Sequence, residues 1–248
     1  MYVIYMLWLR QLKRYVRSRS RIVAALGQPV LYLVALGFGF GPVFRKAGEG
    51  DYIQFLTPGV VGMTVLFTAV FSGIELIWDR QFGFLKETLV APVPRLIIML
   101  GRTLGGATVA VAQGLLVLVI CFAVGFRLPG PGAIAWASLY MTLIALMFTA
   151  FGTALASVLA DFQGFQLVMN FLVMPIFFLS GALFPLADAP KALATVALLD
   201  PLAYGVDGLR HAVAGASYFG PLTDLAVLVG SSAALLALGS YLFSRIEL

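Results

Sequence analysis

Long apolar runs alternate with short polar segments along the whole chain. Six runs reach the length of about 20 residues that a helix needs to cross a bilayer. They lie at residues 22–42, 57–78, 96–126, 133–160, 165–187 and 222–243. The runs lack the alternation of polar and apolar residues that is typical of membrane β-strands. The pattern therefore predicts an all-α polytopic membrane protein with six transmembrane helices.

Residues 1–21 precede the first run and follow a different pattern. Trp8, Leu12 and Tyr15 recur at helical spacing, with basic residues on the rest of each turn. This arrangement is typical of an amphipathic helix that lies in the membrane interface. Such a helix either anchors the chain only or also contacts a cytoplasmic partner. The side chains on which we expect this role to depend are Trp8, Arg10, Lys13, Arg14 and Arg17.

A polar segment, DRQFGFLKETLVAPVPR, separates the second and third runs at residues 79–95. Phe82, Phe84 and Leu85 give it an apolar patch of its own. An apolar patch bordered by charges is typical of a surface that binds another protein. The alternative is a simple loop that its aromatic residues hold at the interface. The charges are those of Arg80, Lys86 and Glu87.

Residues 184–215 form a second unusual segment, before the last run. Pro190 can begin one short helix, and Asp200 can cap another that has Pro201 at its first position and ends at Gly215. Each helix has about 10 to 15 residues, too few to cross a bilayer at 1.5 Å per residue. We therefore expect two short re-entrant or surface helices on the extracytoplasmic side.

Composition supports a membrane protein and its charge sets the orientation. Hydrophobic residues make up 61% of the 248 residues and charged residues 11%, less than half the share of about 25% in soluble domains. A cytoplasmic N-terminus places eleven basic residues inside (Arg10, Lys13, Arg14, Arg17, Arg19, Arg21, Arg80, Lys86, Arg95, Arg102, Arg245) and five outside (Arg45, Lys46, Arg127, Lys191, Arg210). The positive-inside rule therefore predicts a multi-pass protein of the cytoplasmic (inner) membrane with both termini in the cytoplasm. The net charge of +5 suits anionic lipids and needs no nucleic-acid partner.

The residues for catalysis are missing. The sequence lacks the phosphate-binding motif G-x-x-x-x-G-K-[ST], and its single cysteine and single histidine, Cys121 and His211, support neither a disulfide nor a metal site. We expect no enzyme activity and no cofactor on this chain. Glu75 is the one acid clearly within a run, and it is either functional or extends to the cytoplasmic interface.

Four segments in combination resemble the permease subunits of type-2 ABC exporters. They are the basic N-terminus, the insert at 79–95, SGALFPL with Pro185 at the end of the fifth run, and DPLAYGVDGLR before the sixth. The insert looks most like the daunorubicin-resistance branch. The last segment is similar to the family's P-x-x-Y-x-x-D-x-x-R stretch, here Pro201, Tyr204, Asp207 and Arg210. The likeness covers nearly the whole chain, and the order of the motifs is more specific than any one of them.

The resemblance implies an assembly and a division of roles. Two permeases, as a homodimer or with a close paralogue, would assemble with two ABC ATP-binding subunits that hold ATP and Mg. The insert would be the coupling helix in an ATPase groove, and the N-terminal helix would also touch the ATPase. Residues 184–215 would cap the outer end of the pathway, with Asp207 and Arg210 as a local ion pair. The coupling residues would be Arg80, Phe82, Gly83, Phe84, Leu85, Lys86 and Glu87, and the substrate contacts Phe67, Phe71, Phe177 and Phe178.

The hypothesis that follows is an ATP-driven exporter that moves an amphipathic drug, lipid or glycoconjugate out of the cytoplasm. The alternative is a self-sufficient ion-coupled carrier or channel, for which Gln113, Asn170 and Glu75 are few mid-membrane polar groups. A membrane scaffold without transport is a third reading. The substrate is not determined by the residues.

Overall fold

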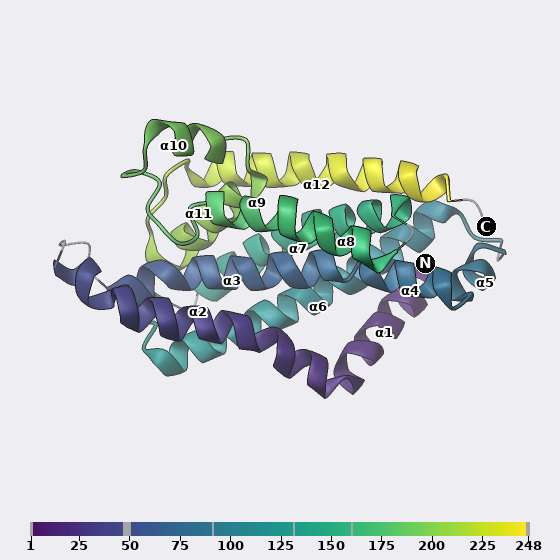
Figure 1. The fold of residues 1–248 in the computed structure, drawn as a ribbon, viewed down its shortest axis with the longest axis horizontal. Helices are drawn as coiled ribbons and strands as arrows, with labels where there is room; N and C mark the ends of the chain where they lie inside the picture. Colours follow the sequence, from purple (N-terminus) through teal and green to yellow (C-terminus); the bar gives the residue numbers. More distant parts are fainter. Residues whose placement is uncertain (1, 47–50, 91, 131, 160, 247–248) are drawn as a thin grey trace.

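The computed structural model describes residues 2–46, 51–90, 92–130, 132–159 and 161–246, with Leu89 lacking a described side chain. All regular elements in these ranges are helices (Figure 1). Residue 1 of the expected interfacial helix, residue 91 of the expected coupling segment and residue 160 of the fourth expected span lie outside the described residues.

Six helical segments in the described ranges are long and apolar enough to cross a membrane, and a bent helix pair would make a seventh if it also spans, so the structure agrees with an all-helical polytopic protein of six or seven candidate spans. The six segments are α2 (Arg19–Lys46), α3 (Tyr52–Phe71) continued by α4 (Ile74–Gln81), α6 (Arg95–Val124), α7 (Gly132–Val158), α8 (Phe162–Val168) continued by the π-helical turn η1 (Met169–Val173) and α9 (Met174–Leu179), and α12 (Pro221–Ser244).

Four further helices lie outside these segments. α1 (Tyr2–Arg17) precedes α2, and α5 (Phe84–Val90) follows α4. α10 (Lys191–Ala197) and α11 (Pro201–Ala214) meet at an angle of 92°, which confirms a bent helix pair before the last span. Figure 1 shows α10 and α11 at one end of the bundle and α5, the start of α1 and the end of α12 at the other. We call these the α10 end and the α5 end.

Two expected helix boundaries are wrong. The second span begins at Tyr52, not at Thr57, because the Asp51 carboxylate caps it by accepting a hydrogen bond of 3.1 Å from the Ile53 amide. The fifth span ends at Leu179, not at residue 187. Gly181 there has φ +72°, a left-handed backbone conformation that stops a helix.

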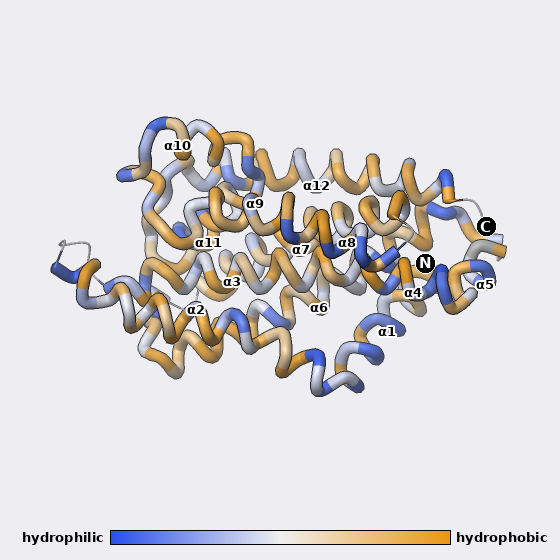
Figure 2. Tube along the Cα trace, in the orientation of Figure 1, coloured by the Kyte–Doolittle hydropathy of each residue, from blue (hydrophilic) through white to orange (hydrophobic). Residues whose placement is uncertain are grey.

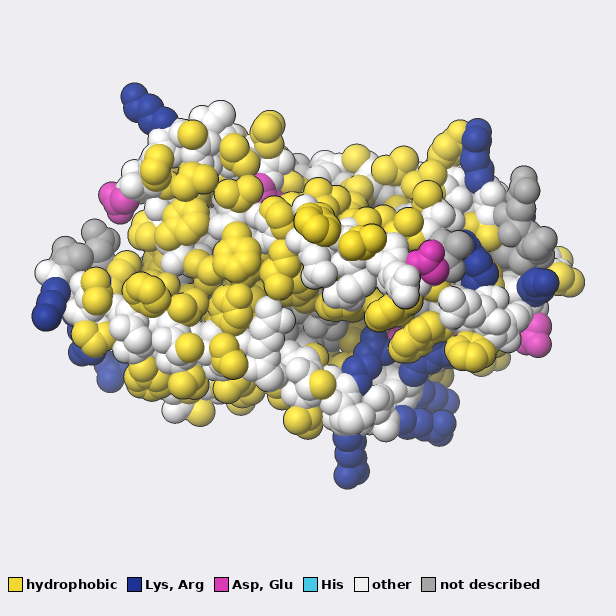
Figure 3. Space-filling view, viewed as in Figure 1, with side chains coloured by type: hydrophobic (Ala, Val, Ile, Leu, Met, Phe, Trp, Pro, Cys, Tyr) yellow, Lys and Arg dark blue, Asp and Glu magenta, His cyan; other side chains and the backbone are white. Residues whose placement is uncertain are grey.

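α3 forms the centre of the bundle. Of the apolar stretch in each span, 83% of the residues are buried in the α3–α4 segment, but only 17% in α2 and in α12. The outer helices therefore keep apolar surface for lipid or for another subunit. Figure 2 shows hydrophobic residues along all the long helices, and Figure 3 shows hydrophobic side chains over the middle of this face.

Glycines allow two close helix contacts. A Cβ atom on Gly73 would overlap the Gly152 carbonyl oxygen, so the break between α3 and α4 lies directly against α7. On α6, Gly101 faces Leu7, and a Cβ atom on Gly105 would lie 2.8 Å from the Gln11 side chain. The small residues at Gly101–Gly105 and at Gly152 therefore form helix-packing surfaces.

Candidate functional site: a charge cluster at the α5 end

Six charged side chains from four helices meet near the α5 end of the bundle. Glu75 and Asp79 lie one turn apart on α4, so both project from the same face of that helix. They are only 5% and 4% exposed. The cations around them are Arg10 and Arg14 of α1, Arg21 of α2 and Arg102 of α6.

Asp79 binds α1 and α6 at once. Arg10 donates two hydrogen bonds to its carboxylate, Nη2 to Oδ1 at 2.8 Å and Nη1 to Oδ2 at 3.2 Å. Arg102, 5% exposed, also donates to Oδ2. A two-pronged arginine–carboxylate contact fixes direction as well as distance, and charge-assisted bonds are stronger than neutral ones. Asp79 therefore determines how α1 is seated against the bundle.

Glu75 is held in the same way. Arg21 Nη1 lies 2.7 Å from Oε1, and Arg14 Nη1 lies 3.2 Å from Oε2. Glu75 is buried between these two arginines and does not extend into solvent. Four guanidinium groups thus face two carboxylates, and the cluster keeps two positive charges in excess.

Neutral hydrogen bonds attach the rest of α1. Trp8 Nε1 donates to Thr108 Oγ1 of α6 at 3.0 Å, and the Tyr15 hydroxyl donates to Gln113 Oε1. Gln113 in turn donates to the Ile22 carbonyl of α2 at 3.3 Å. Burial raises the pKa of the Tyr15 phenol, which keeps it a donor. The amphipathic N-terminal helix is therefore packed onto α6 through specific contacts.

The expected coupling patch is divided by a turn. α4 ends at Gln81, Gly83 takes a left-handed conformation with φ +79°, and α5 then turns back. Phe82 is 85% exposed at this turn, whereas Leu85 is 1% exposed and packs inward. The Arg10 guanidinium lies over the Phe84 ring, 3.7 Å from its centroid. Only Phe82 of the three apolar residues is therefore free to enter a groove of a partner.

Charges near this turn also divide into two groups. Lys86 and Glu87 are exposed, as the sequence predicts for a rim. Arg80 instead donates to the carbonyls of Leu159 and Ser157, both at 3.1 Å, beyond the end of α7 and at its last turn. An arginine at a helix C-terminus satisfies free carbonyls and complements the helix dipole. Arg80 thus joins α4 to α7 and is not a rim charge.

At the α10 end, the expected Asp207–Arg210 pair is wrong. The Asp207 carboxylate accepts hydrogen bonds from Ser217 Oγ and from the amides of Tyr218 and Phe219, at 2.8–2.9 Å. Arg210 donates to the Gly181 carbonyl at 3.0 Å and lies over the Phe55 ring. Backbone amides and carbonyls therefore bind both side chains, and each joins α11 to a different segment.

The other residues of this motif also support the bent helix pair. Asp200 caps α11 by accepting from the Leu202 amide at 2.8 Å, with Pro201 at the first helical position. The Tyr204 hydroxyl donates to the Leu198 carbonyl at 3.0 Å, and its ring stacks on Phe219. Pro185 lies in the non-helical chain between α9 and α10. These contacts hold α10 and α11 in their bent arrangement.

A cleft of about 460 Å³ lies beside the cluster and has walls from α1, α2, α3, α4 and α8. Phe67 and Phe71 line it, together with Trp78, and Arg21 and Glu75 lie in its wall. Phe177 is fully buried behind Phe67, with ring centroids 6.1 Å apart, and Phe178 is half-exposed. The structure thus brings two of the four expected aromatic contacts, Phe67 and Phe71, into one cavity.

The charge cluster itself is absent from the sequence-based predictions. Two regularities point to it: Glu75 and Asp79 are four residues apart at the end of an apolar run, and so are Arg10 and Arg14 in the preceding basic helix. Residues at this spacing share a helix face, so the two acids of one helix are candidates to pair with the two arginines of the other.

The fold and this site define a polytopic membrane protein in which an amphipathic N-terminal helix is ion-paired to the spans. Residues 2–213 match the model of the ABC-2 type transporter family. The chain belongs to that family, as a transmembrane permease of the kind that works with ATP-binding subunits.

The matches to named relatives cover most of the chain. It is 28% identical to the transport permease ycf38 of Cyanophora paradoxa over 209 residues, 82% of this chain and 71% of that protein. It is 28% identical to nodulation protein J of Rhizobium leguminosarum bv. trifolii over 219 residues, 86% and 79% of the two chains. It is 27% identical to the inner membrane transport permease YadH of Escherichia coli K12 over 227 residues, 90% and 87%.

Proposed function

We propose that this permease exports an amphipathic drug, lipid or glycoconjugate from the cytoplasm, driven by ATP hydrolysis on a separate subunit. Two permease copies and two ATPases form the transporter in the cytoplasmic (inner) membrane, with the α5 end and both termini in the cytoplasm. The excess of basic residues toward the α5 end supports this orientation. The inner-membrane location of the relative YadH agrees with it.

The observation that carries the proposal is the exposed Phe82 at a turn that is tied to the spans. A single aromatic side chain, 85% exposed and bordered by Lys86 and Glu87, is the kind of anchor that fills a pocket on a partner. Phe84 in the same turn contacts Arg10, and Arg10 binds Asp79. Force applied to α5 therefore reaches α1, α4 and α6 through charge-assisted contacts.

The cleft supports an amphipathic substrate. Its aromatic residues, Phe67, Phe71 and Trp78, offer apolar surface, while Arg21 and Glu75 offer charge at one place in the wall. A molecule with an apolar body and a polar head would satisfy both. The cleft opens beside the same acid, Glu75, that binds α1 and α2, so movement of the coupling helix would change its shape.

Reconstitution tests the proposal. Proteoliposomes with the permease and its co-purifying ATPase should export substrate only when ATP is supplied, and Phe82→Ala should abolish export and most of the co-purification. Leu199→Ala is the matched control, because Leu199 is 84% exposed near the α10 end and should tolerate the change. Transport by the permease alone under an ion gradient would support the carrier alternative and overturn the proposal.

A further inference from the structure

The corner between α1 and α2 carries a concentration of positive charge, of which the ion-pair cluster uses only a part. A hollow of about 860 Å³, the elbow pocket, lies where α1 ends at Arg17 and α2 begins at Arg19. No acid of the described residues lines it. Five cations do: Arg10, Lys13, Arg14, Arg17 and Arg19.

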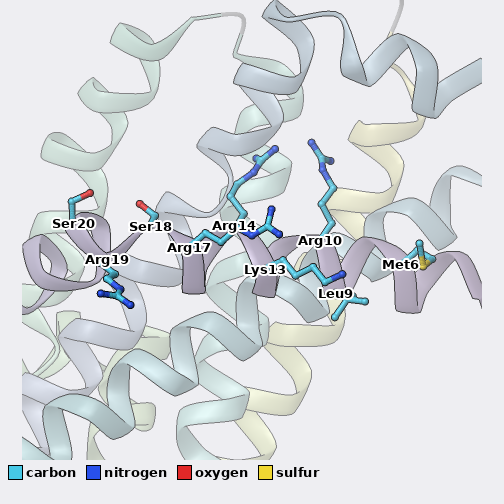
Figure 4. Close-up of a pocket in the computed structure, with 9 residues that line it drawn as sticks. All are labelled: Met6, Leu9, Arg10, Lys13, Arg14, Arg17, Ser18, Arg19 and Ser20. Carbon is cyan, nitrogen blue, oxygen red and sulfur yellow. The ribbon is translucent and has the colours of Figure 1, made fainter.

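These cations are of two kinds. Arg10 and Arg14 are held in place by Asp79 and Glu75, and Figure 4 shows both extending to the same side of α1. Lys13, Arg17 and Arg19 are exposed and have no hydrogen-bond or ion-pair partner within the ranges that the structure describes. Since the neighbouring cluster already has an excess of positive charge, the elbow pocket presents positive charge that an anion from outside the chain can neutralise.

We propose that the elbow pocket binds the phosphate headgroup of an anionic phospholipid. Arginine matches phosphate through two-pronged hydrogen bonds, and lysine supplies a further point charge. The hydroxyl groups of Ser18 and Ser20 line the same hollow and can donate to phosphate oxygens. Basic pockets at the cytoplasmic face of membrane helices are typical lipid-headgroup sites.

Apolar side chains beside the cations favour a lipid over an acidic protein surface. Met6 and Leu9 line the pocket itself, and Val16 and Val23, on either side of the corner, are 66% and 68% exposed. Acyl chains of a bound lipid would cover such residues, whereas an acidic protein surface would leave them in contact with polar groups.

The position of the corner between α1 and α2 also favours a lipid over a protein partner. Figure 1 shows that it lies along the length of the bundle, nearer to the middle than α5 does. α2, the first span, begins at Arg19, so the pocket is at the level where the span enters the bilayer. A subunit docked on α5 would approach the end of the bundle, and a lipid would approach this corner from the side.

Native mass spectrometry of the purified permease tests the site without the ATPase, so its outcome does not depend on the proposed export function. Wild-type protein should retain phosphatidylglycerol more tightly than phosphatidylcholine. The triple variant Lys13→Gln, Arg17→Gln, Arg19→Gln should bind phosphatidylglycerol roughly a hundredfold more weakly, at about 1 kcal/mol for each basic residue near an anionic surface. It leaves every ion pair of the cluster in place.

Controls separate the site from general electrostatics and from misfolding. Arg45→Gln, Lys46→Gln, Lys191→Gln removes the same charge from exposed positions at the α10 end and should leave binding unchanged. Lys13→Arg, Arg17→Lys, Arg19→Lys keeps the charge and should retain the lipid.

Three results would overturn the proposal: equal retention of the two lipids, equal loss in the α10-end control, or displacement of the lipid by millimolar inorganic phosphate. The last would mean a site for a soluble anion. In a parallel co-purification of the triple variant with the ATPase, loss of the ATPase together with unchanged lipid binding would overturn the lipid site and assign this surface to the ATPase.

Discussion

Asp79→Asn should destabilise the permease strongly, although it changes the shape of the side chain very little. The substitution keeps the shape of the side chain but removes the charge that neutralises Arg102, which is 5% exposed, and that binds Arg10 in two places. Removing one partner of a buried ion pair costs about 3–5 kcal/mol, because the other charge is left buried and unpaired. Arg10 is 30% exposed and can turn to water, so we expect the lower part of this range, about 3 kcal/mol.

The free energy of unfolding in detergent, from denaturant titration, measures this effect. Glu87→Gln is the matched control: it makes the same chemical change on an exposed side chain of α5 and should stay within about 0.5 kcal/mol of wild type. The double variant Asp79→Asn, Arg102→Met should recover part of the loss, since an apolar residue then replaces the unpaired charge. If Asp79→Asn unfolds at the wild-type denaturant concentration, the cluster does not fix α1 and the reasoning fails.

Three further substitutions test the packing. Gly105→Leu should separate α1 from α6, because even a Cβ atom would lie 2.8 Å from Gln11. It should lower the free energy of unfolding, measured by heat or denaturant, by about 1–3 kcal/mol. Gly27→Leu, at a site with open space, should cost less, and equal effects would refute the contact. Gly73→Ala should abolish the monodisperse peak of folded protein in size-exclusion chromatography, since its Cβ atom would overlap the Gly152 backbone. Gly39→Ala, at a site with open space, should keep that peak. A monodisperse Gly73→Ala peak would contradict the α3–α7 crossing. Arg80→Gln should remove hydrogen bonds at the end of α7 and lower the free energy of unfolding by about 1–3 kcal/mol. It should also speed amide hydrogen exchange near Ser157. Unchanged exchange there would show that Arg80 does not cap α7.

The number of spans could be predicted from the sequence because hydropathy depends on local composition, and a bilayer requires about 20 apolar residues in each crossing. The boundaries could not, since single residues set them. Thr57–Pro58 is a sound helix start by local rules, yet Asp51 supplies a cap several residues earlier and α3 continues through Pro58. Gly181 ends α9 through its left-handed backbone, a property that an apolar sequence does not reveal.

Contacts between residues that are distant in the sequence explain why the site could be predicted only in part. Asp79 meets Arg10 of α1 because Gly101 and Gly105 let α1 lie against α6, and it also meets Arg102 of α6. Helical spacing alone could identify these charges but not join them. Asp207 and Arg210 have the right spacing for a local pair, but the carboxylate binds free amides of the segment after α11 and the arginine binds the free Gly181 carbonyl after α9. Phe82, Phe84 and Leu85 are close in sequence, and one glycine turn gives them three different environments.

Cross-linking at position 82 tests most directly whether α5 receives the ATPase. Cys121, the one native cysteine, is fully buried, so Phe82→Cys introduces a reactive thiol at an 85%-exposed position while the native thiol stays protected. A short thiol cross-linker should join this variant to the ATP-binding subunit, and Leu199→Cys near the α10 end should give no such product. If the thiol introduced by Phe82→Cys stays fully open to a maleimide in the assembled complex, or Leu199→Cys cross-links equally well, the ATPase does not dock on α5 and the account is contradicted.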